Sequence, residues 1–292
     1  MKFQVITDST SDLDFNDRNQ YKIDYLKMVF TIDEKQYDAD LDWSIIDPDT
    51  YYRLMRSGKR SITSLIKQEE TYQKFEQYLK EGKDVLYVTC SSKLSGSINS
   101  ATIIAKELEE KYPNQKVICF DSLKSNYAEG YMAIEAAKLA NKGFGIDKAI
   151  TKLNEIQHHL QTWATVGSLT YMKNAGRVKA STAFFGNLFH VKPIVVTDRS
   201  GQNAAFKKVK GRKESLDELV NIINLRQSDN NDYPIIIEHA NCLEDAKYVL
   251  KKIKTELGLK AFIKTLGPII GATCGPDTIT INFYGKEIDF VL

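Results

Sequence analysis

Residues 85–111 read VLYVTCSSKLSGSINSATIIAKELEEK, and this stretch decides the class of fold. The run 85–89 is short and apolar, as expected of a buried strand. The segment 97–111 predicts an amphipathic helix, because apolar side chains recur at three- and four-residue steps: Ile98, Ala101, Ala105 and Leu108. A buried strand, a polar loop and a helix that packs back on the sheet form the repeating unit of an α/β protein.

The same alternation continues on both sides of this unit. Short apolar runs predict further strands at 3–7, 116–120, 163–167, 193–197, 204–209, 235–238, 261–266 and 278–283. Segments of helical period predict helices at 50–55, 69–80, 128–141, 146–159, 214–225 and 243–257. A turn is expected at 199–201 and a polar surface loop at 227–232. The pattern predicts a parallel or mixed sheet flanked by helices.

The length of the chain favours two domains over one. At 292 residues it exceeds the usual size of a single compact domain, so two α/β domains that share a cleft are expected. The transition is placed near the segment 168–178, which ends in Ala175-Gly176-Arg177. We therefore expect an N-terminal domain at 1–165 and a C-terminal domain at 166–292.

Composition and charge narrow the class of function. The chain has 42% hydrophobic and 27% charged residues, the balance of an ordinary globular protein. Its formal net charge of +2 is far below the basic excess that nucleic-acid binding demands, so no nucleic-acid partner is expected. No apolar run approaches the length of a membrane span, and the N-terminus lacks the apolar stretch of a signal peptide. We expect a cytoplasmic protein with reduced cysteines.

Three clusters of hydroxyl side chains are candidate binding segments. The densest, residues 89–97, connects the strand and helix quoted above, and there Ser95-Gly96 pairs a hydroxyl with a glycine that permits close approach of a ligand. The cluster 7–12 follows the first strand and should lie at the same sheet edge. The cluster 61–64 lies between two helical segments. Each cluster also fits a helix cap or a turn, and that alternative stays open.

The sequence offers little support for catalysis or a cofactor. None of His158, His159, His190 and His239 is evidently placed to activate a serine, which disfavours a hydrolase. The chain has neither of the glycine-rich loops that cradle nucleotide phosphates. The four cysteines are not spaced as metal ligands or redox pairs, so neither a metal nor a cofactor is expected.

Taken together, the polar clusters resemble the DegV family, bacterial fatty-acid-binding proteins that work with a fatty acid kinase. The resemblance covers nearly the whole chain, about residues 3–291. It rests on the order and spacing of seven segments: Thr7 to Leu13, Thr63-Ser64, Ser91 to Ser97, Asp121-Ser122, Gly176-Arg177-Val178, Gly186 to Pro193 and Gly271 to Pro276.

The resemblance implies a mostly parallel N-terminal sheet, a mixed C-terminal sheet and a lipid tunnel between the domains. It assigns the fatty acid carboxylate to Thr63 and Ser95, with Ser92, Gly96, Arg177 and Thr273 as supporting positions. In such a tunnel a sixteen-carbon tail gains on the order of 10 kcal/mol, before the costs of ordering are counted. Relatives of this kind present the acid to a separate ATP-binding kinase, which forms an acyl phosphate.

One departure from the family keeps other functions open. Many relatives carry a histidine where this chain has Thr273, followed by Cys274. The first alternative is an enzyme, either a phosphotransferase-type subunit or a serine hydrolase. The second is a carrier of another amphiphile in the same tunnel.

Overall fold

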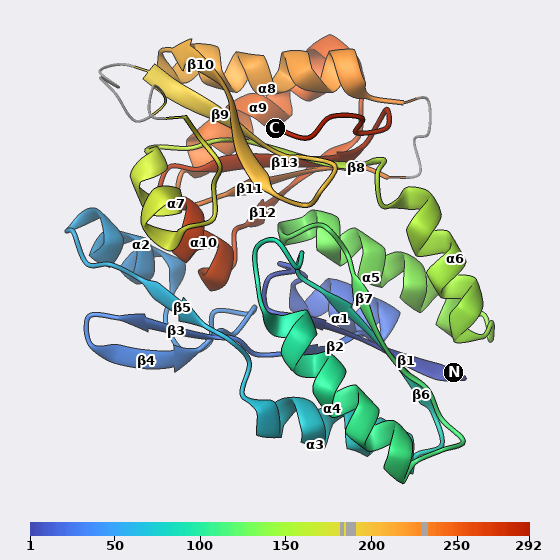
Figure 1. Ribbon diagram of the computed structural model, residues 1–292. Helices are drawn as coiled ribbons and strands as arrows, with labels where there is room; N and C mark the ends of the chain where they lie inside the picture. Colours follow the sequence, from blue (N-terminus) through green and yellow to red (C-terminus); the bar gives the residue numbers. More distant parts are fainter. Residues whose placement is uncertain (182–183, 185–190, 229–232) are drawn as a thin grey trace.

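The computed structural model describes residues 1–181, 184, 191–228 and 233–292. The segment 186–193, part of the family resemblance, lies largely outside this range, as do His190 and most of the expected loop 227–232. Within the described residues, the strands form one four-stranded, one six-stranded and one three-stranded sheet. Figure 1 shows the four-stranded sheet below the six-stranded one, with helices between and around them.

The first half of the chain builds the parallel sheet that was expected. Its strands lie in the order β2-β1-β6-β7, and every pairing is parallel. Their bounds are β1 Phe3–Asp8, β2 Asp24–Leu26, β6 Asp84–Thr89 and β7 Val117–Asp121. Helices α3 (Gln68–Lys80) and α4 (Ser97–Lys111) pack on β6 and β7. Polar loops leave the carboxyl ends of β1 and β6 side by side, which positions the site described below.

Helix α5 (Asn126–Asn141) lies between the two large sheets. It contacts β1 and β6 on one side and β8 and β13 on the other. Twelve of its residues are buried, and they fall on all sides of the helix. The helix is rich in alanine and also contains Gly130, so both sheets approach it closely. Two further helices flank it, α1 (Phe15–Tyr21) and α6 (Ile146–Ile156).

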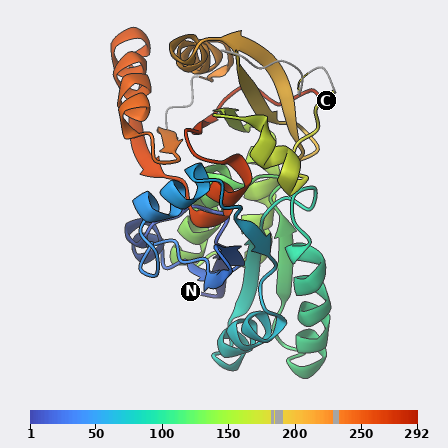
Figure 2. The ribbon, with the colours of Figure 1, turned by 90° about the vertical axis from the view of Figure 1, so that its left-hand side faces the viewer.

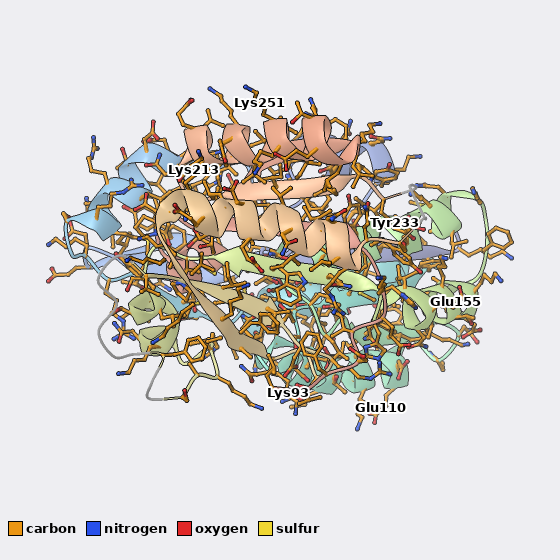
Figure 3. All side chains as sticks on the ribbon, turned by 90° about the horizontal axis from the view of Figure 1, so that it is seen from above. Lys93, Glu110, Glu155, Lys213, Tyr233 and Lys251 are labelled. Atoms are coloured by element: carbon orange, nitrogen blue, oxygen red, sulfur yellow. The ribbon has the colours of Figure 1, made fainter. Side chains whose placement is uncertain are left out.

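The second half builds a mixed sheet in the order β10-β9-β8-β13-β11-β12. Its bounds are β8 Leu160–Thr165, β9 Val191–Thr197, β10 Asn203–Lys210, β11 Ile235–His239, β12 Ala261–Thr265 and β13 Ile279–Tyr284. Only the β11–β12 pairing is parallel among these described strands. Figure 3 shows two helices over its outer face, α8 (Arg212–Arg226) and α9 (Leu243–Lys252), with Lys213 and Lys251 labelled on them. The expected helix 243–257 continues beyond α9 as a π-helical turn, Ile253–Leu257.

Strand β8 bears on the expected domain division. It ends at Thr165, the last residue of the expected N-terminal domain, but it pairs with β9 and β13 in the six-stranded sheet. By strand pairing, the second sheet therefore starts at Leu160. The division into 1–165 and 166–292 stays a prediction.

A small antiparallel sheet in the order β4-β3-β5 was not predicted. Its strands are β3 Val29–Ile32, β4 Lys35–Asp38 and β5 Ile62–Ser64. The cluster 61–64, which also fitted a helix cap or a turn, is mostly a strand, and Thr63 pairs with Phe30. Helix α2 (Pro48–Arg56) packs beside this sheet through Tyr51, whose ring meets Phe30 edge to face.

Two short helices join this region to the second half: α7 (Leu169–Ala175) and α10 (Pro268–Cys274). In Figure 2, α10 is the red helix near the centre, between the two halves. The hydroxyl of Tyr51 donates to the carbonyl of Pro268 at 2.8 Å, and that of Tyr52 to the carbonyl of Leu266 at 3.1 Å. Gly271 is required here, because a Cβ at this position would lie 2.3 Å from the Tyr52 hydroxyl.

Candidate ligand-binding site

An inner cavity of about 170 Å³ lies where the two halves of the chain meet. Seven of its lining residues carry apolar or sulfur-containing side chains: Met28, Leu65, Cys90, Leu94, Ile269, Ile270 and Cys274. The others are polar: Thr10, Thr63, Ser64, Ser95, Ser125, Arg177, Asn203 and Thr273. The cavity thus combines apolar surface with convergent polar groups, which is a feature of small-molecule sites.

The structure brings Thr63 and Ser95 into this one cavity. Thr63 is held by β5, which pairs with β3, and its hydroxyl has no hydrogen-bond partner among the described residues. Ser95 lies in the loop before α4, where its Oγ accepts a hydrogen bond from the Ser97 amide at 3.2 Å and lies 2.9 Å from the Ser97 Oγ. The predicted binding serine is therefore also part of the helix start, so the two interpretations of this cluster are compatible.

Arg177 and Thr273 reach the same cavity from the second half. Arg177 follows Gly176, which ends α7 in the left-handed conformation with φ of 68°. Its guanidinium donates from Nε to the carbonyl of Leu94 at 2.6 Å and from Nη1 to the carbonyl of Ala175 at 2.7 Å. Arg177 thus bridges the two halves directly beside Ser95. The Thr273 hydroxyl donates to the carbonyl of Ile269 within α10 at 3.3 Å.

The other two supporting positions do not line the cavity. Ser92 is exposed, and its amide donates to Oδ1 of Asp121 at 3.2 Å. A Cβ at Gly96 would only reach ordinary contact with Leu65, at 3.7 Å, so no contact within the described part of the protein requires the glycine. The binding segment 89–97 therefore contributes to the cavity through Cys90, Leu94 and Ser95.

A wider outer cavity of about 450 Å³ adjoins the inner one and shares Thr63, Arg177 and Thr273 with it. It also contains Lys59 and Arg60. The guanidinium of Arg60 donates to the carbonyl of Asn174 at 2.6 Å, which ties the segment before β5 to α7. Lys59 forms an ion pair with Asp33 at 2.7 Å, so the net positive charge at this opening comes from Arg60 and Arg177. A net positive charge there attracts anions.

Beneath the inner cavity, Thr10 is held between two buried carboxyls. Its hydroxyl oxygen lies 2.5 Å from Oδ1 of Asp8 and 2.6 Å from Oε2 of Glu129. Tyr87 and Thr7 donate to the remaining oxygens of the two acids, at 2.7 Å and 2.9 Å. Because the Thr10 hydroxyl has one proton for two acceptors, one carboxyl must be protonated. Burial, the main cause, accordingly raises the pKa of both acids.

This network confirms one expectation and adds residues that the sequence did not reveal. The cluster 7–12 was expected at the sheet edge near Ser95, and Thr10 lines the same cavity as Ser95. Asp8 orients that loop, since it also accepts from the Thr10 amide at 2.9 Å. Glu129 was hidden within a helix, and Asn203 begins a strand. Neither has a local pattern that marks it as part of a site.

Other classes of site find no support among the described residues. No group of three or more histidine, cysteine or acidic side chains there is arranged to hold a metal ion. Of the three histidines that the structure describes, none lines the inner cavity. Burial raises the pKa of the Cys274 thiol to about 12, so this thiol is neutral and unreactive. None of the described helices has the length and apolar character needed to cross a bilayer.

Comparison with known proteins places this geometry in a family. The model of an uncharacterised protein family, DegV, matches residues 2–286. A DegV domain-containing protein of Clostridium perfringens is 32% identical over 285 residues, which is 97% of this chain and 98% of the relative.

Two solved structures share the fold. One, from Thermus thermophilus, is described as fatty acid binding of a DegV family protein; its TM-score is 0.88 at 22% identity, with 98% of this chain and all of that chain covered. The other is a stearic acid-binding protein from Eubacterium ventriosum, with a TM-score of 0.85 at 21% identity. The match covers 97% of this chain and 98% of that chain. With the matches to the family model and to the Clostridium relative, these findings show that the chain belongs to the DegV family.

Proposed function

We propose that this chain binds a long-chain fatty acid between its two halves, with the carboxylate at Thr63 and Ser95. The observation that carries the proposal is the inner cavity, in which two hydroxyls from separate segments face a lining of apolar and sulfur-containing side chains. The fatty acids that two structural neighbours bind, as their descriptions state, support the choice of ligand. The inner cavity alone is below the roughly 300 Å³ at which most ligand sites begin, so we expect its walls to part further when a long tail binds.

The tail and the carboxylate of the fatty acid contribute differently to binding. Each buried methylene of the tail contributes about 0.8 kcal/mol, so the tail supplies most of the affinity. Hydroxyl donors fix the position of the carboxylate without the strong, bidentate bond that a buried arginine gives. Such a carboxylate keeps its nucleophilicity and remains able to react.

We further propose that the chain is a carrier that presents the acid to a separate fatty acid kinase, and is not itself an enzyme. The outer cavity supports this, because Arg177 and Arg60 line a space next to the carboxylate position, together with Lys59, which is paired with Asp33. An acyl phosphate formed there would place its phosphoryl group among these cations. The kinase must bring the nucleotide, since this sequence has no glycine-rich phosphate loop. The four free cysteines fit a cytoplasmic carrier.

Native mass spectrometry of the protein purified from bacteria tests the ligand assignment. We expect an adduct with the mass of a fatty acid of about fourteen to eighteen carbons. In the double variant Thr63→Ala/Ser95→Ala the adduct should be reduced at least about tenfold, because about two hydrogen bonds to a charged group are lost. The matched control Thr151→Ala/Thr255→Ala removes two exposed hydroxyls and should retain the full adduct. An undiminished adduct in the first variant would contradict the site.

A second candidate function follows from the small inner cavity. With Thr273 and Cys274 at its wall and only about 170 Å³ of space, it also suits an amphiphile with a shorter or differently shaped tail. The extracted ligand distinguishes the two candidates. A mass that matches no fatty acid would favour the second.

A further inference from the structure

Two buried acids face each other across the seam between the four-stranded and six-stranded sheets. Asp12 lies in the loop after β1, two residues beyond Thr10, and is 5% exposed. Glu238 lies in β11 of the six-stranded sheet and is fully buried. The pair is close enough for a hydrogen bond between the two carboxyls. Both acids act electrostatically on the Cys274 thiol, which lines the inner cavity. Asp12 also lines a separate cavity of about 610 Å³, together with Asp14, Asp42 and Lys264.

Only one of the four carboxyl oxygens of this pair accepts hydrogen bonds from neighbouring side chains that the structure describes. Glu238 Oε2 accepts from the Thr280 hydroxyl at 2.8 Å and from the Asn282 amide at 2.6 Å. Its Oε1 and both carboxyl oxygens of Asp12 are buried and accept no well-formed hydrogen bond from a described residue. Two ionised carboxylates in this arrangement would repel each other and leave three acceptors unsatisfied. One proton held between the carboxyls removes the repulsion and joins two of these three oxygens in a hydrogen bond.

No positive charge stands near enough to replace that proton among the described groups that face the pair. Asp12 is faced by Glu129 of α5, by Tyr52 of α2, by Cys274 of α10 and by the backbone of Gly267. Glu238 is faced by Tyr131 and by the Tyr127 backbone, both of α5, and by Thr280 and Asn282 of β13. Lys264, its register partner on β12, directs its ammonium to Asp14 and Asp17 instead. The neighbouring His239 is half-buried, and burial lowers its pKa, so it is neutral.

We propose that one proton shared by Asp12 and Glu238 holds the two halves of the molecule together, and that its loss at alkaline pH loosens the seam and speeds ligand release. Asp12 lies in the loop after β1 of the four-stranded sheet and Glu238 lies in the six-stranded sheet, so their repulsion acts across the seam. The loop that carries Asp12 also carries Thr10, which lines the inner cavity. A displacement of this loop therefore reaches the ligand.

The sign of the pH effect follows from proton binding. Burial and the partner carboxyl raise the pKa of Asp12 well above its usual value, and burial raises that of Glu238 to about 6. The folded protein thus holds a proton that the unfolded chain releases near pH 4. The stabilisation is complete below about pH 4 and is lost as pH rises through the range where the folded pair gives up its last proton.

Thermal or urea unfolding between about pH 5 and about pH 8 tests the shared proton. In Glu238→Gln, the side-chain amide donates to Asp12 and its oxygen still accepts from Thr280 and Asn282, so the proton is no longer needed. As pH rises, the folding equilibrium constant of the wild type should fall more steeply than that of the variant. The difference should reach up to about tenfold per pH unit. Asp12→Asn is a second route to the same result, because asparagine tolerates the positive φ of 51° at this position. The exposed control Glu244→Gln should keep the wild-type slope.

Ligand release gives the functional readout. The probe is cis-parinaric acid, a fluorescent fatty acid, and its release rate is measured from the wild type and from Glu238→Gln at each pH. The ratio of the two rates should rise several-fold from about pH 6 to about pH 9. Equal pH slopes in the wild type and both amide variants would overturn the proposal. So would a divalent metal that co-purifies in stoichiometric amount and whose removal by a chelator abolishes the wild-type pH slope.

Discussion

The buried acids described above lie beside hydrogen-bond donors or beside a second acid, whereas the buried amine of Lys124 has no such partner in the described part of the chain. Its side chain is fully buried, and its Nζ has no hydrogen-bond partner among the described residues. Burial is the main cause that lowers the pKa of this amine to about 7, while the carboxylate of Asp198 opposes the shift. A neutral or half-charged amine in the interior costs folding free energy, because the same amine is fully protonated in the unfolded chain.

We therefore expect Lys124→Met to stabilise the protein near pH 7 by about 1–4 kcal/mol, since an apolar side chain of similar size needs no solvation. The contribution of Lys124 to wild-type stability should become less unfavourable as pH rises from about 7 to about 10, because over this range only the unfolded chain binds this proton. Urea denaturation at several pH values measures both effects. The variant should lack this part of the slope, whereas the exposed control Lys142→Met should retain it. A variant less stable than the wild type at neutral pH would contradict the account.

At the scale of elements, α5 shows how closely the layers pack. Gly130 lies in the interior of this helix, where a Cβ would meet the carbonyl oxygen of Ser11 and the side chain of Leu13, each at 2.7 Å. The loop that carries Thr10 and Asp12 therefore rests directly on the helix backbone. The glycine is retained for packing, although helix propensity disfavours it.

Two physical effects oppose each other in Gly130→Ala. Helix propensity alone predicts a gain of about 1 kcal/mol. We expect instead a net loss of about 1–3 kcal/mol, because the loop must move away from the helix and its contacts with the site are strained. Denaturant unfolding measures the sign. Asn154→Ala, on the exposed face of α6, is the matched helix control and should be neutral or slightly stabilising.

Elements were predictable from sequence where one periodicity dominates. Strand β6 and helix α4 have clear apolar patterns, and the predicted bounds of α4 are correct. The three-stranded sheet was missed because β4 is polar and half exposed and β5 has only three residues. Helix α10 was missed for the opposite reason, since six of its seven residues are buried and no polar face marks its period.

The same limit applies to the candidate site. Ser95 was predictable because it follows a buried strand, where loops of parallel sheets bind ligands. Thr63 was singled out by resemblance alone, because its partner strand β3 lies about thirty residues away and carries no pattern that points to Thr63. Glu129 depends on a contact between residues 119 positions apart, which no local pattern encodes.

At the scale of the whole molecule, the two large sheets share no described strand and meet through side chains. Arg177 joins the second half to the loop before α4, and Arg56 of α2 donates to Asp277 at 2.7 Å and to Asn241 at 2.5 Å. These polar contacts are partly exposed, and they accompany a buried apolar cluster in which Phe30 and Tyr52 of the first half pack with Ile269 of the second. The inner cavity lies within the same junction. A ligand there contacts both halves, so its binding free energy adds to the stability of their association.

Removal of the ligand should therefore weaken the whole fold. If the lipid is stripped from the protein, we expect its melting temperature to fall, because only the folded protein binds the ligand. Palmitate added at about one hundred times its dissociation constant should restore about 2.7 kcal/mol. An eight-carbon acid buries eight fewer methylenes, a gross loss on the order of 6 kcal/mol, and should give almost no shift at the same concentration. Differential scanning calorimetry of the stripped and reloaded protein measures these shifts. Equal stabilisation by both acids would mean that the tail lies outside the junction, because only a buried tail makes the stability of both halves depend on chain length.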